Sequence, residues 1–254
     1  MLELPILFSF AFFAGMIDAA VGGGGLIQIP ALLNALPAAP EATLFGTNKL
    51  ASVCGTSVAA RAFIGRVNIP WVLVLPAALS AFVMAFLGAA GVSHIPPGSL
   101  RPLVLVLIVA MAIYTFRKKD FGKIQRPLDI GRRERALSVF IGGGIGFYDG
   151  IFGPGTGSFL IFLFIRCFAF DFLQASASAK YVNIATNVAA LIYFVPSGSV
   201  LYAIAVPMAV CNMLGAYAGS WVAMKRGTGF IRILFLCLLT LLIAKLAYDL
   251  VRSA

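Results

Sequence analysis

Long apolar stretches without a single charged residue are the feature that most constrains this fold. Residues 67–93, 102–116 and 233–244 contain no Asp, Glu, Lys or Arg. About 20 apolar residues in a helix span the ~30 Å hydrocarbon core of a bilayer. Charged residues make up only 11% of the chain, against about 25% in soluble domains. The sequence therefore predicts an all-α polytopic membrane protein.

Positive charge is concentrated in one segment. Of the 19 Lys and Arg residues, eight lie between Arg117 and Arg135. Short loops rich in Lys and Arg stay in the cytoplasm, next to anionic lipid. We therefore relate the net charge of +10 to membrane orientation, and we expect the lipid bilayer and no nucleic acid as a partner. The N-terminus lacks the basic region of a cleaved signal peptide, so its apolar segment is expected to remain in the mature fold.

The cysteines and the single histidine indicate no metal, cofactor or disulfide chemistry. Each of the four cysteines stands alone in an apolar run, and His94 has no cysteine near it in the sequence. Metal sites and disulfide frameworks need clustered or regularly spaced ligands. We expect small, packed side chains at these positions and no cofactor.

The sequence matches itself when it is shifted by 131 residues. Asp18 aligns with Asp149, and Lys49 aligns with Lys180. Many matches of uncommon residues at one offset indicate an ancient duplication. We predict a first repeat at residues 1–123 and a second at residues 124–254, with four hydrophobic segments in each and one membrane domain in total. Other matches are Gly22 with Gly153, Gly24 with Gly155, Pro76 with Pro207, Gly88 with Gly219 and Arg101 with Arg232.

Each repeat is expected to contain one glycine-broken segment followed by three transmembrane helices. In the first repeat the broken segment covers residues 2–36, and the helices cover 41–65, 70–92 and 98–116. In the second repeat the broken segment covers residues 135–168, and the helices cover 171–194, 199–224 and 230–250.

The charges on the connecting turns predict that the repeats are inverted in the membrane. With the loop 117–135 in the cytoplasm, the turn at 61–68 also lies inside, where Arg61 and Arg66 fit the positive-inside rule. The matching turn at 196–198 carries no charge and falls outside. The plasma membrane, in a bacterium the inner membrane, is the expected location, with both termini outside.

Inversion requires an odd number of crossings per repeat. Each broken segment must then either re-enter and leave on one side or make two complete crossings. We favour a re-entrant hairpin, because a second arm of about 12 residues is too short to cross a bilayer.

The glycine-rich breaks mark the predicted binding site. Residues 22–25 are four glycines, and residues 153–157 read Gly-Pro-Gly-Thr-Gly. Paired breaks at matching positions of two repeats are typical of a transporter's binding site. Each break starts a helix, near Gly25 and near Gly157, whose free N–H groups attract anions. Close helix packing through glycine is the structural alternative.

Two lysines lie deep in apolar sequence, each beside polar residues. Lys49 and Lys180 are both placed about 12 Å below a membrane face. A charge at that depth is costly, so it is expected to be paired with an opposite charge or to have a function. Ser52 follows Lys49 by three residues, as Asn183 follows Lys180, so each polar pair shares a helix face. The predicted anion-binding residues are Lys49, Thr47, Asn48, Ser52, Gly24 and Gly25 from the first repeat, and Lys180, Ser178, Asn183, Asn187, Thr156, Gly157 and Ser158 from the second.

Two aspartates precede the breaks, at the C-terminal end of the first arm. A carboxylate there opposes the helix dipole and must be neutralised by a proton or a lysine. Asp18 and Asp149 are therefore either static counter-ions of the lysines or proton carriers coupled to anion movement, and the residues alone do not separate these roles.

The paired motifs resemble those of the TauE/SafE sulfite exporter family, also called the TSUP family. In the first repeat they read Gly15-Met-Ile-Asp-Ala-Ala-Val-Gly-Gly-Gly-Gly and Phe45-Gly-Thr-Asn-Lys-Leu-Ala-Ser. The second repeat carries degenerate copies, beginning at Gly146 and Ser178. The resemblance implies a prokaryotic plasma-membrane permease for sulfite or an organosulfonate. Combined with the charged site, it predicts a secondary transporter that binds a small sulfur-containing anion near the midplane and couples it to protons.

Two other functions fit part of the pattern. A passive anion channel could use the same site. An intramembrane aspartyl protease would also carry two buried aspartates, and Tyr148-Asp149 is similar to the Tyr-Asp motif of those enzymes. However, Asp18 stands in Met-Ile-Asp and lacks the Gly-x-Gly-Asp partner motif. We therefore expect a transporter and no enzyme.

Overall fold

Helices account for almost all of the chain that the structure describes. The computed structural model describes residues 3–92, 106, 109, 113–115, 117, 121–122 and 130–253. No strand occurs among these residues, in agreement with the expected all-α fold. Most of the predicted helix at 98–116 and of the basic loop at 117–135 lies outside the described residues.

The helix boundaries fall close to the predicted segments. In the first half they are α1 (Glu3–Val21), α2 (Gly24–Ala35), α3 (Glu41–Phe63) and α4 (Trp71–Gly91). In the second half they are α6 (Arg132–Ile151), α7 (Thr156–Phe168), α8 (Phe172–Phe194) and α9 (Tyr202–Ser253). The long element α9 is two helices joined at Gly227, whose φ of 70° interrupts the helix between the two predicted spans.

Helix α6 begins three residues earlier than expected. The Glu134 carboxylate accepts a hydrogen bond of 2.9 Å from the Gly131 N–H. A side chain that reaches back in this way satisfies a helix N-terminus and fixes its first turn. The polar residues 132–135 therefore extend the helix beyond its apolar part.

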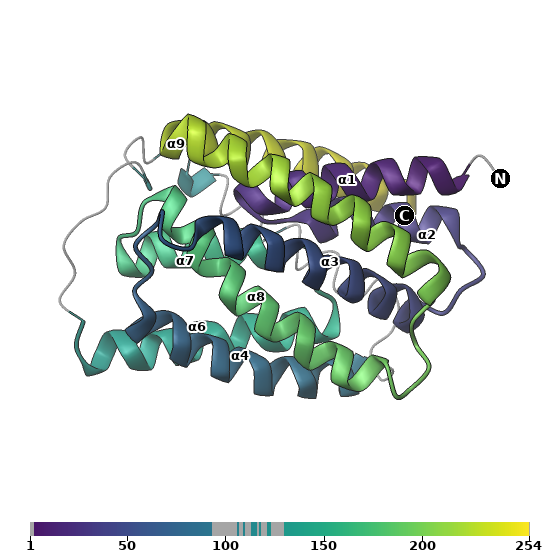
Figure 1. The fold of residues 1–254 in the computed structure, drawn as a ribbon, viewed down its shortest axis with the longest axis horizontal. Coiled ribbons are helices and arrows are strands. Elements are labelled where there is room, and N and C mark those ends of the chain that lie inside the picture. Colours follow the sequence, from purple (N-terminus) through teal and green to yellow (C-terminus); the bar gives the residue numbers. More distant parts are fainter. Residues whose placement is uncertain are drawn as a thin grey trace.

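Each glycine-rich break turns the chain back on itself. Gly22 and Gly23 have φ of 71° and 92°, and Gly153 and Gly155 have φ of 90° and 88°, values that glycine adopts readily. The first break forms a hairpin of antiparallel α1 and α2 (Figure 1). The second arms are short: α2 has 12 residues and α7 has 13, or roughly 18–20 Å. Neither is long enough to cross a ~30 Å hydrocarbon core.

The two halves of the chain interlock. Helix α4 packs along α6, and the first part of α9 packs along α1. Helices α3 and α8, which run in opposite directions in Figure 1, also pack against each other and against α9 and α4, respectively. The main apolar core therefore forms between the halves, in a cluster that joins α4, α7, α8 and the second part of α9.

Small residues allow the interlocking helices to come close. Gly146 and Gly150 of α6 lie against the backbone of Ala81 and Ala85 of α4. Gly219 of α9 lies in the same way against the backbone of α1. Backbone contact of this kind is how membrane helices gain dispersion energy without large side chains.

The outer faces of the bundle are apolar. Leu75, Leu79 and Val83 of α4 are exposed, as are Val206 and Leu214 of α9. Among the described residues, Leu4–Val21 and Trp71–Gly91 have the length and hydropathy of membrane spans. Apolar surface of this extent suits contact with lipid.

The close contact between α4 and α6 predicts the effect of adding one methyl group. A Cβ at residue 146 would lie about 2.5 Å from the Ala81 backbone, so Gly146→Ala should destabilise the fold by about 1–3 kcal/mol. Gly144 on the same helix has open space around it, and Gly144→Ala should have no such cost. Thermal unfolding in detergent measures both, and equal unfolding temperatures for the two variants would contradict this packing.

Candidate functional site

Two buried ion pairs lie at the centre of the bundle. The Lys49 Nζ is 2.6 Å from Oδ2 of Asp149, and the Lys180 Nζ is 3.2 Å from Oδ2 of Asp18. Both lysine side chains are almost completely buried, and Lys180 has no exposed surface. Each pair joins one half of the chain to the other, because the lysine of one half bonds the aspartate of the opposite half.

The helix breaks complete the bonding of both aspartates. The Thr156 hydroxyl, in the first turn of α7, donates a hydrogen bond of 2.6 Å to Oδ1 of Asp149. The Gly24 N–H, in the first turn of α2, donates one of 3.3 Å to Oδ1 of Asp18. Lys180 also donates to the main-chain oxygen of Asp18. The carboxylates therefore link each helix end to the helix that starts after the break.

The two breaks touch each other. The backbone of Gly22 lies against the backbone of Gly157, and a Cβ on either glycine would overlap the other segment. The Ser158 hydroxyl donates a hydrogen bond of 3.2 Å to the Val21 carbonyl, which the end of α1 leaves without a helical partner. The Ser176 hydroxyl donates one of 2.8 Å to the Ala20 carbonyl. Both breaks thus lie at one level in the middle of the bundle.

A small polar cavity lies between the breaks and the ion pairs. The residues that line it are Asp18, Gly23, Gly25, Asn48, Lys49, Ser52, Asp149, Gly153, Gly155, Thr156, Gly157, Asn183 and Asn187. The centres of water molecules can occupy about 20 Å³ of it, which is room for about one water. It brings together most of the residues predicted to bind an anion, from both halves.

Several groups around this cavity can donate to an anion. Gly25 and Gly157 are second residues of α2 and α7, where backbone N–H groups lack intrahelical acceptors. Positive dipole ends of two helices add to the lysine charges. Asn48 is 95% buried, and its amide oxygen has no hydrogen-bond partner among the described residues. The site is thus rich in donors and carries one unsatisfied amide.

Five of the predicted site residues do not line the cavity. Lys180 and Gly24 lie behind Asp18 and contact it. Thr47 bonds the Thr43 carbonyl at 2.7 Å and accepts from the Leu201 N–H at 3.0 Å. Ser158 bonds the Val21 carbonyl. Ser178 is completely buried, without a hydrogen-bond partner among the described residues.

A buried amide pair next to this region was not predicted from the sequence. The Asn212 amide donates a hydrogen bond of 2.9 Å to the Gln28 oxygen, and both side chains are buried. Gln28 follows Gly24 by one helical turn on α2. The positions that match them at the offset of 131 are Phe159 and Ala81, so the repeat comparison could not reveal them. The only sequence feature that marks Gln28 and Asn212 is that each is a polar residue within an apolar helix.

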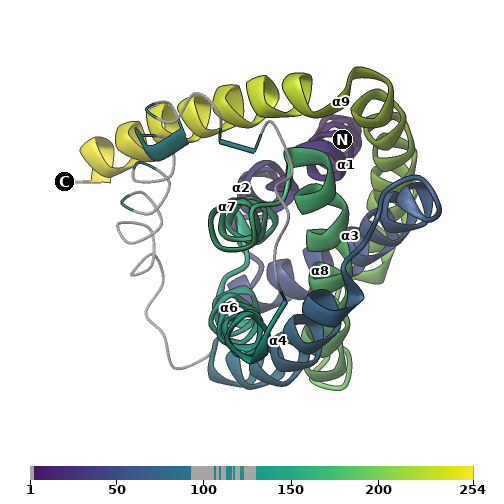
Figure 2. The ribbon, with the colours of Figure 1, turned by 90° about the vertical axis from the view of Figure 1, so that its left-hand side faces the viewer.

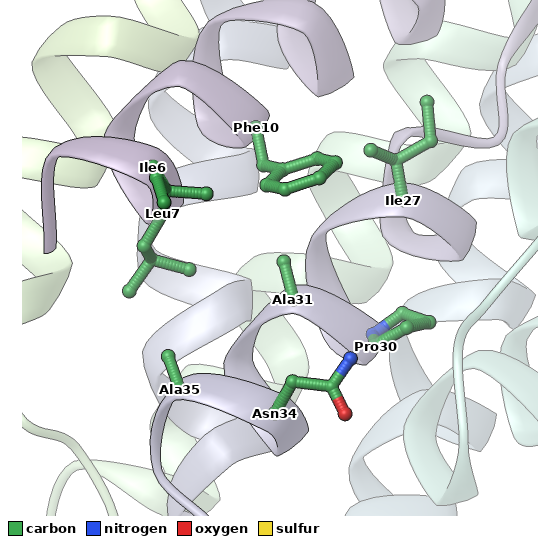
Figure 3. A pocket seen from close by; sticks show the side chains of 8 residues that line it. All are labelled: Ile6, Leu7, Phe10, Ile27, Pro30, Ala31, Asn34 and Ala35. Carbon is green, nitrogen blue, oxygen red and sulfur yellow. The ribbon is translucent and has the colours of Figure 1, made fainter. Parts of the chain in front are cut away.

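A second cavity lies between the arms of the first hairpin. It is lined by Ile6, Leu7 and Phe10 of α1 and by Ile27, Pro30, Ala31, Asn34 and Ala35 of α2 (Figure 3). None of the described residues that line it is charged, so these residues offer no charge to hold an anion. The central cavity is the stronger candidate site.

The bonding of the aspartates differs from that of a protease. A catalytic pair of aspartates shares one proton between two adjacent carboxyl groups. Here Asp18 and Asp149 each bond a lysine. Their charges are already neutralised, which suits a counter-ion or a proton site.

The pairing of each lysine with the aspartate of the opposite half predicts which second substitution restores the stability lost when a lysine is removed. Lys49→Met leaves Asp149 as a buried carboxylate without its cation, at a cost of about 3–5 kcal/mol. Adding Asp149→Asn removes that charge and keeps an acceptor for Thr156, so the unfolding temperature should recover.

Adding Asp18→Asn instead is the matched control, because Asp18 bonds the other lysine. It should lower the unfolding temperature further. Rescue by Asp18→Asn and not by Asp149→Asn would show that the pairs are assigned wrongly.

Comparison with known proteins places the chain in a family. The family model for the sulfite exporter TauE/SafE matches residues 7–246. A probable membrane transporter protein ORF9 of Sinorhizobium sp is 35% identical over 97% of this chain and 93% of its own. The probable membrane transporter protein YfcA of Escherichia coli K12 is 34% identical over 98% of this chain and 91% of its own. No solved structure gives a significant match.

These matches extend over nearly the whole chain and agree with the transporter prediction, not with the protease alternative. The resemblance based on the paired glycine and lysine motifs is confirmed. This chain belongs to the sulfite exporter TauE/SafE family of membrane transporters.

Proposed function

We propose that this chain is a secondary transporter that carries a small sulfur-containing anion, such as sulfite or an organosulfonate, together with a proton. The single observation that carries the proposal is the central cavity, which is lined by Lys49, Asp149 and Asp18 and bordered by two lysine–aspartate pairs that each join the two halves. Membership of the sulfite exporter TauE/SafE family supports a sulfur oxyanion as cargo. The free N–H groups of two helix ends support an anion rather than a cation.

The charge balance of the site supports proton coupling. Two lysines and two aspartates give a formal charge of zero in a region with little water. An added anion would leave a net negative charge at low dielectric, which is costly. Protonation of one aspartate frees its lysine to bind the anion and restores neutrality. A monoanion would therefore move with one proton.

The size of the cavity supports a site that opens during transport. It has room for about one water, whereas sulfite has four heavy atoms. An anion can enter only if a carboxylate moves away from its lysine. Opening an ion pair also loosens a contact between the halves, and this links anion binding to movement of one half against the other.

The contact between the breaks supports inverted, re-entrant repeats. If α1 and α6 both crossed the bilayer completely from opposite sides, Gly22 and Gly157 would lie on opposite surfaces. Their backbones touch instead, as expected when both hairpins end near the midplane. The opposite directions of α3 and α8 in Figure 1 also agree with inversion.

The distribution of charge supports an orientation. The α3–α4 turn, the start of α6 and the kink in α9 lie at one end of the bundle, at the left in Figure 1. This end carries Arg61, Arg66, Arg132, Arg133, Arg135, Lys225 and Arg226. The opposite end has the uncharged turn at 196–198 and the start of α1. The basic end is therefore assigned to the cytoplasm, in a bacterial inner membrane, with both termini outside.

Flux into proteoliposomes tests the transport proposal. Sulfite, sulfate, thiosulfate and short sulfonates should be compared at imposed pH gradients. We expect a proton gradient to drive concentrative uptake of at least one anion, and Lys49→Ala and Lys180→Ala to abolish it in folded protein. Full flux in either lysine variant would contradict the assignment of these lysines to the anion site. Asp149→Asn should remove the pH dependence of the remaining flux, because asparagine cannot carry the proton.

The Thr43→Ala variant is a matched control, since Thr43 lies on α3 outside the cavity lining and contributes only its main-chain carbonyl to Thr47. It should keep normal flux. Flux that is only downhill and indifferent to the pH gradient would identify a passive channel instead.

Cysteine labelling in cells tests the orientation. In a cysteine-free background, Ser197→Cys in the α8–α9 turn should react with an impermeant maleimide from outside. Asn68→Cys in the α3–α4 turn should react only after the cells are made permeable. Reaction of both from one side would contradict inverted repeats.

A further inference from the structure

Four exposed cations gather where the α3–α4 turn meets the kink of α9. Arg61 and Arg66 come from the first half, and Lys225 and Arg226 come from the second. The Arg66 guanidinium lies 3.6 Å from the sulfur of Met224, which fixes the contact between these distant segments. Figure 2, which views this end of the bundle, shows the end of α3 next to α9. We name these four residues the α3–α9 basic patch.

Aromatic side chains border the patch. The Lys225 ammonium lies 4.7 Å above the ring centroid of Trp221. On the other side, the Trp71 ring meets the Tyr181 ring at 4.6 Å between centroids. A hollow beside them is lined by Gly65, Asn68, Ile69, Trp71 and Tyr181, among others, and the centres of water molecules can occupy about 260 Å³ of it.

We propose that the α3–α9 basic patch and its hollow bind the headgroup of an anionic phospholipid. Exposed Trp and Tyr rings favour the depth of lipid headgroups, and both tryptophans are about half exposed. Arginine forks and a lysine supply the donors that a phosphate needs. Basic pockets between membrane helices are known to hold such headgroups.

One acidic residue, Asp171, lies near the hollow, and its carboxylate is already engaged in a hydrogen bond. Asp171 precedes α8, whose Gln174 side chain donates to the Asn68 carbonyl at 2.9 Å beside the hollow. Its Oδ1 accepts a hydrogen bond of 2.7 Å from the Gln174 N–H and caps that helix. The Asp171 carboxylate is therefore engaged in capping α8, and the four cations outnumber it. The matching end of the second half has only the uncharged turn at 196–198, so the site occurs at one membrane surface.

Tryptophan fluorescence offers a selective readout. The chain contains two tryptophans, and both border this patch. The full chain should be reconstituted in phosphatidylcholine bilayers with increasing fractions of phosphatidylglycerol that has brominated acyl chains, which quench tryptophan on contact. We expect brominated phosphatidylglycerol to quench at a several-fold lower mole fraction than brominated phosphatidylcholine. Equal quenching by the two lipids would overturn the proposal.

Two matched variants separate a site from general attraction. Arg66→Gln with Arg226→Gln should weaken the preference about fivefold for each lost charge. Arg132→Gln with Arg133→Gln removes the same charge from the same end but on α6, away from the kink (Figures 1 and 2), and should keep the preference. An equal loss in both variants would show diffuse attraction only and would overturn the site.

A soluble competitor tests the source of the phosphate. Glycerol 3-phosphate at millimolar concentration carries the headgroup chemistry without acyl chains, so it should not reverse the quenching. Reversal would assign the patch to a free anion instead of a lipid. Each variant is compared with its own fluorescence without brominated lipid, after its unfolding temperature has shown that it is folded.

Discussion

Neutralising two lysines inside an apolar bundle is the requirement on which the rest of the structure depends. A buried ammonium is tolerated only with a carboxylate and further hydrogen bonds around the pair. Lys49 and Lys180 obtain these carboxylates from the opposite half, at 2.6 and 3.2 Å. In this fold neither lysine bonds the aspartate of its own half. The ion pairs therefore explain why the halves interlock and do not pack as two separate bundles.

The glycines at the breaks make this exchange of partners possible. For Asp18 to reach Lys180 and Asp149 to reach Lys49, the two breaks must cross at the centre. Gly22 and Gly157 lie in backbone contact there, so no side chain fits between them. The same crossing points the first turns of α2 and α7 at one cavity. Glycine-rich sequence thus supplies both the close approach and the exposed N–H groups.

The sequence predicted the helices well, because long apolar runs and glycine breaks act locally. It also identified both lysines and both aspartates, because a buried charge in an apolar run is costly and therefore indicates a structural or functional role. It could not tell which carboxylate bonds which lysine. Asp18 is nearer to Lys49 in sequence, and only the crossing of the breaks gives it Lys180 instead.

Helix geometry explains why some predicted residues miss the cavity. Thr47 and Ser178 each precede their lysine by two residues, which places them on roughly the opposite face of the helix. Ser52 and Asn183, three residues after the lysines, share the lysine's face and line the cavity. A cluster of polar residues in the sequence therefore includes residues that lie outside the site. Helical spacing shows which of them share the face that lines the cavity.

The two ion pairs are formed by residues that match at the offset of 131, but their geometry differs. Asp149 has short bonds to Lys49 and Thr156, both 2.6 Å, and its side chain is 3% exposed. Asp18 has longer side-chain bonds of 3.2–3.4 Å, and its side chain is 15% exposed. The position that matches Thr156 in the first half is Gly25, which has no hydroxyl to offer. In the proposed cycle, the Asp18 pair therefore costs less to open. The two matching aspartates therefore differ in their hydrogen bonds, and the replacement of a threonine by a glycine at one matching position accounts for part of that difference.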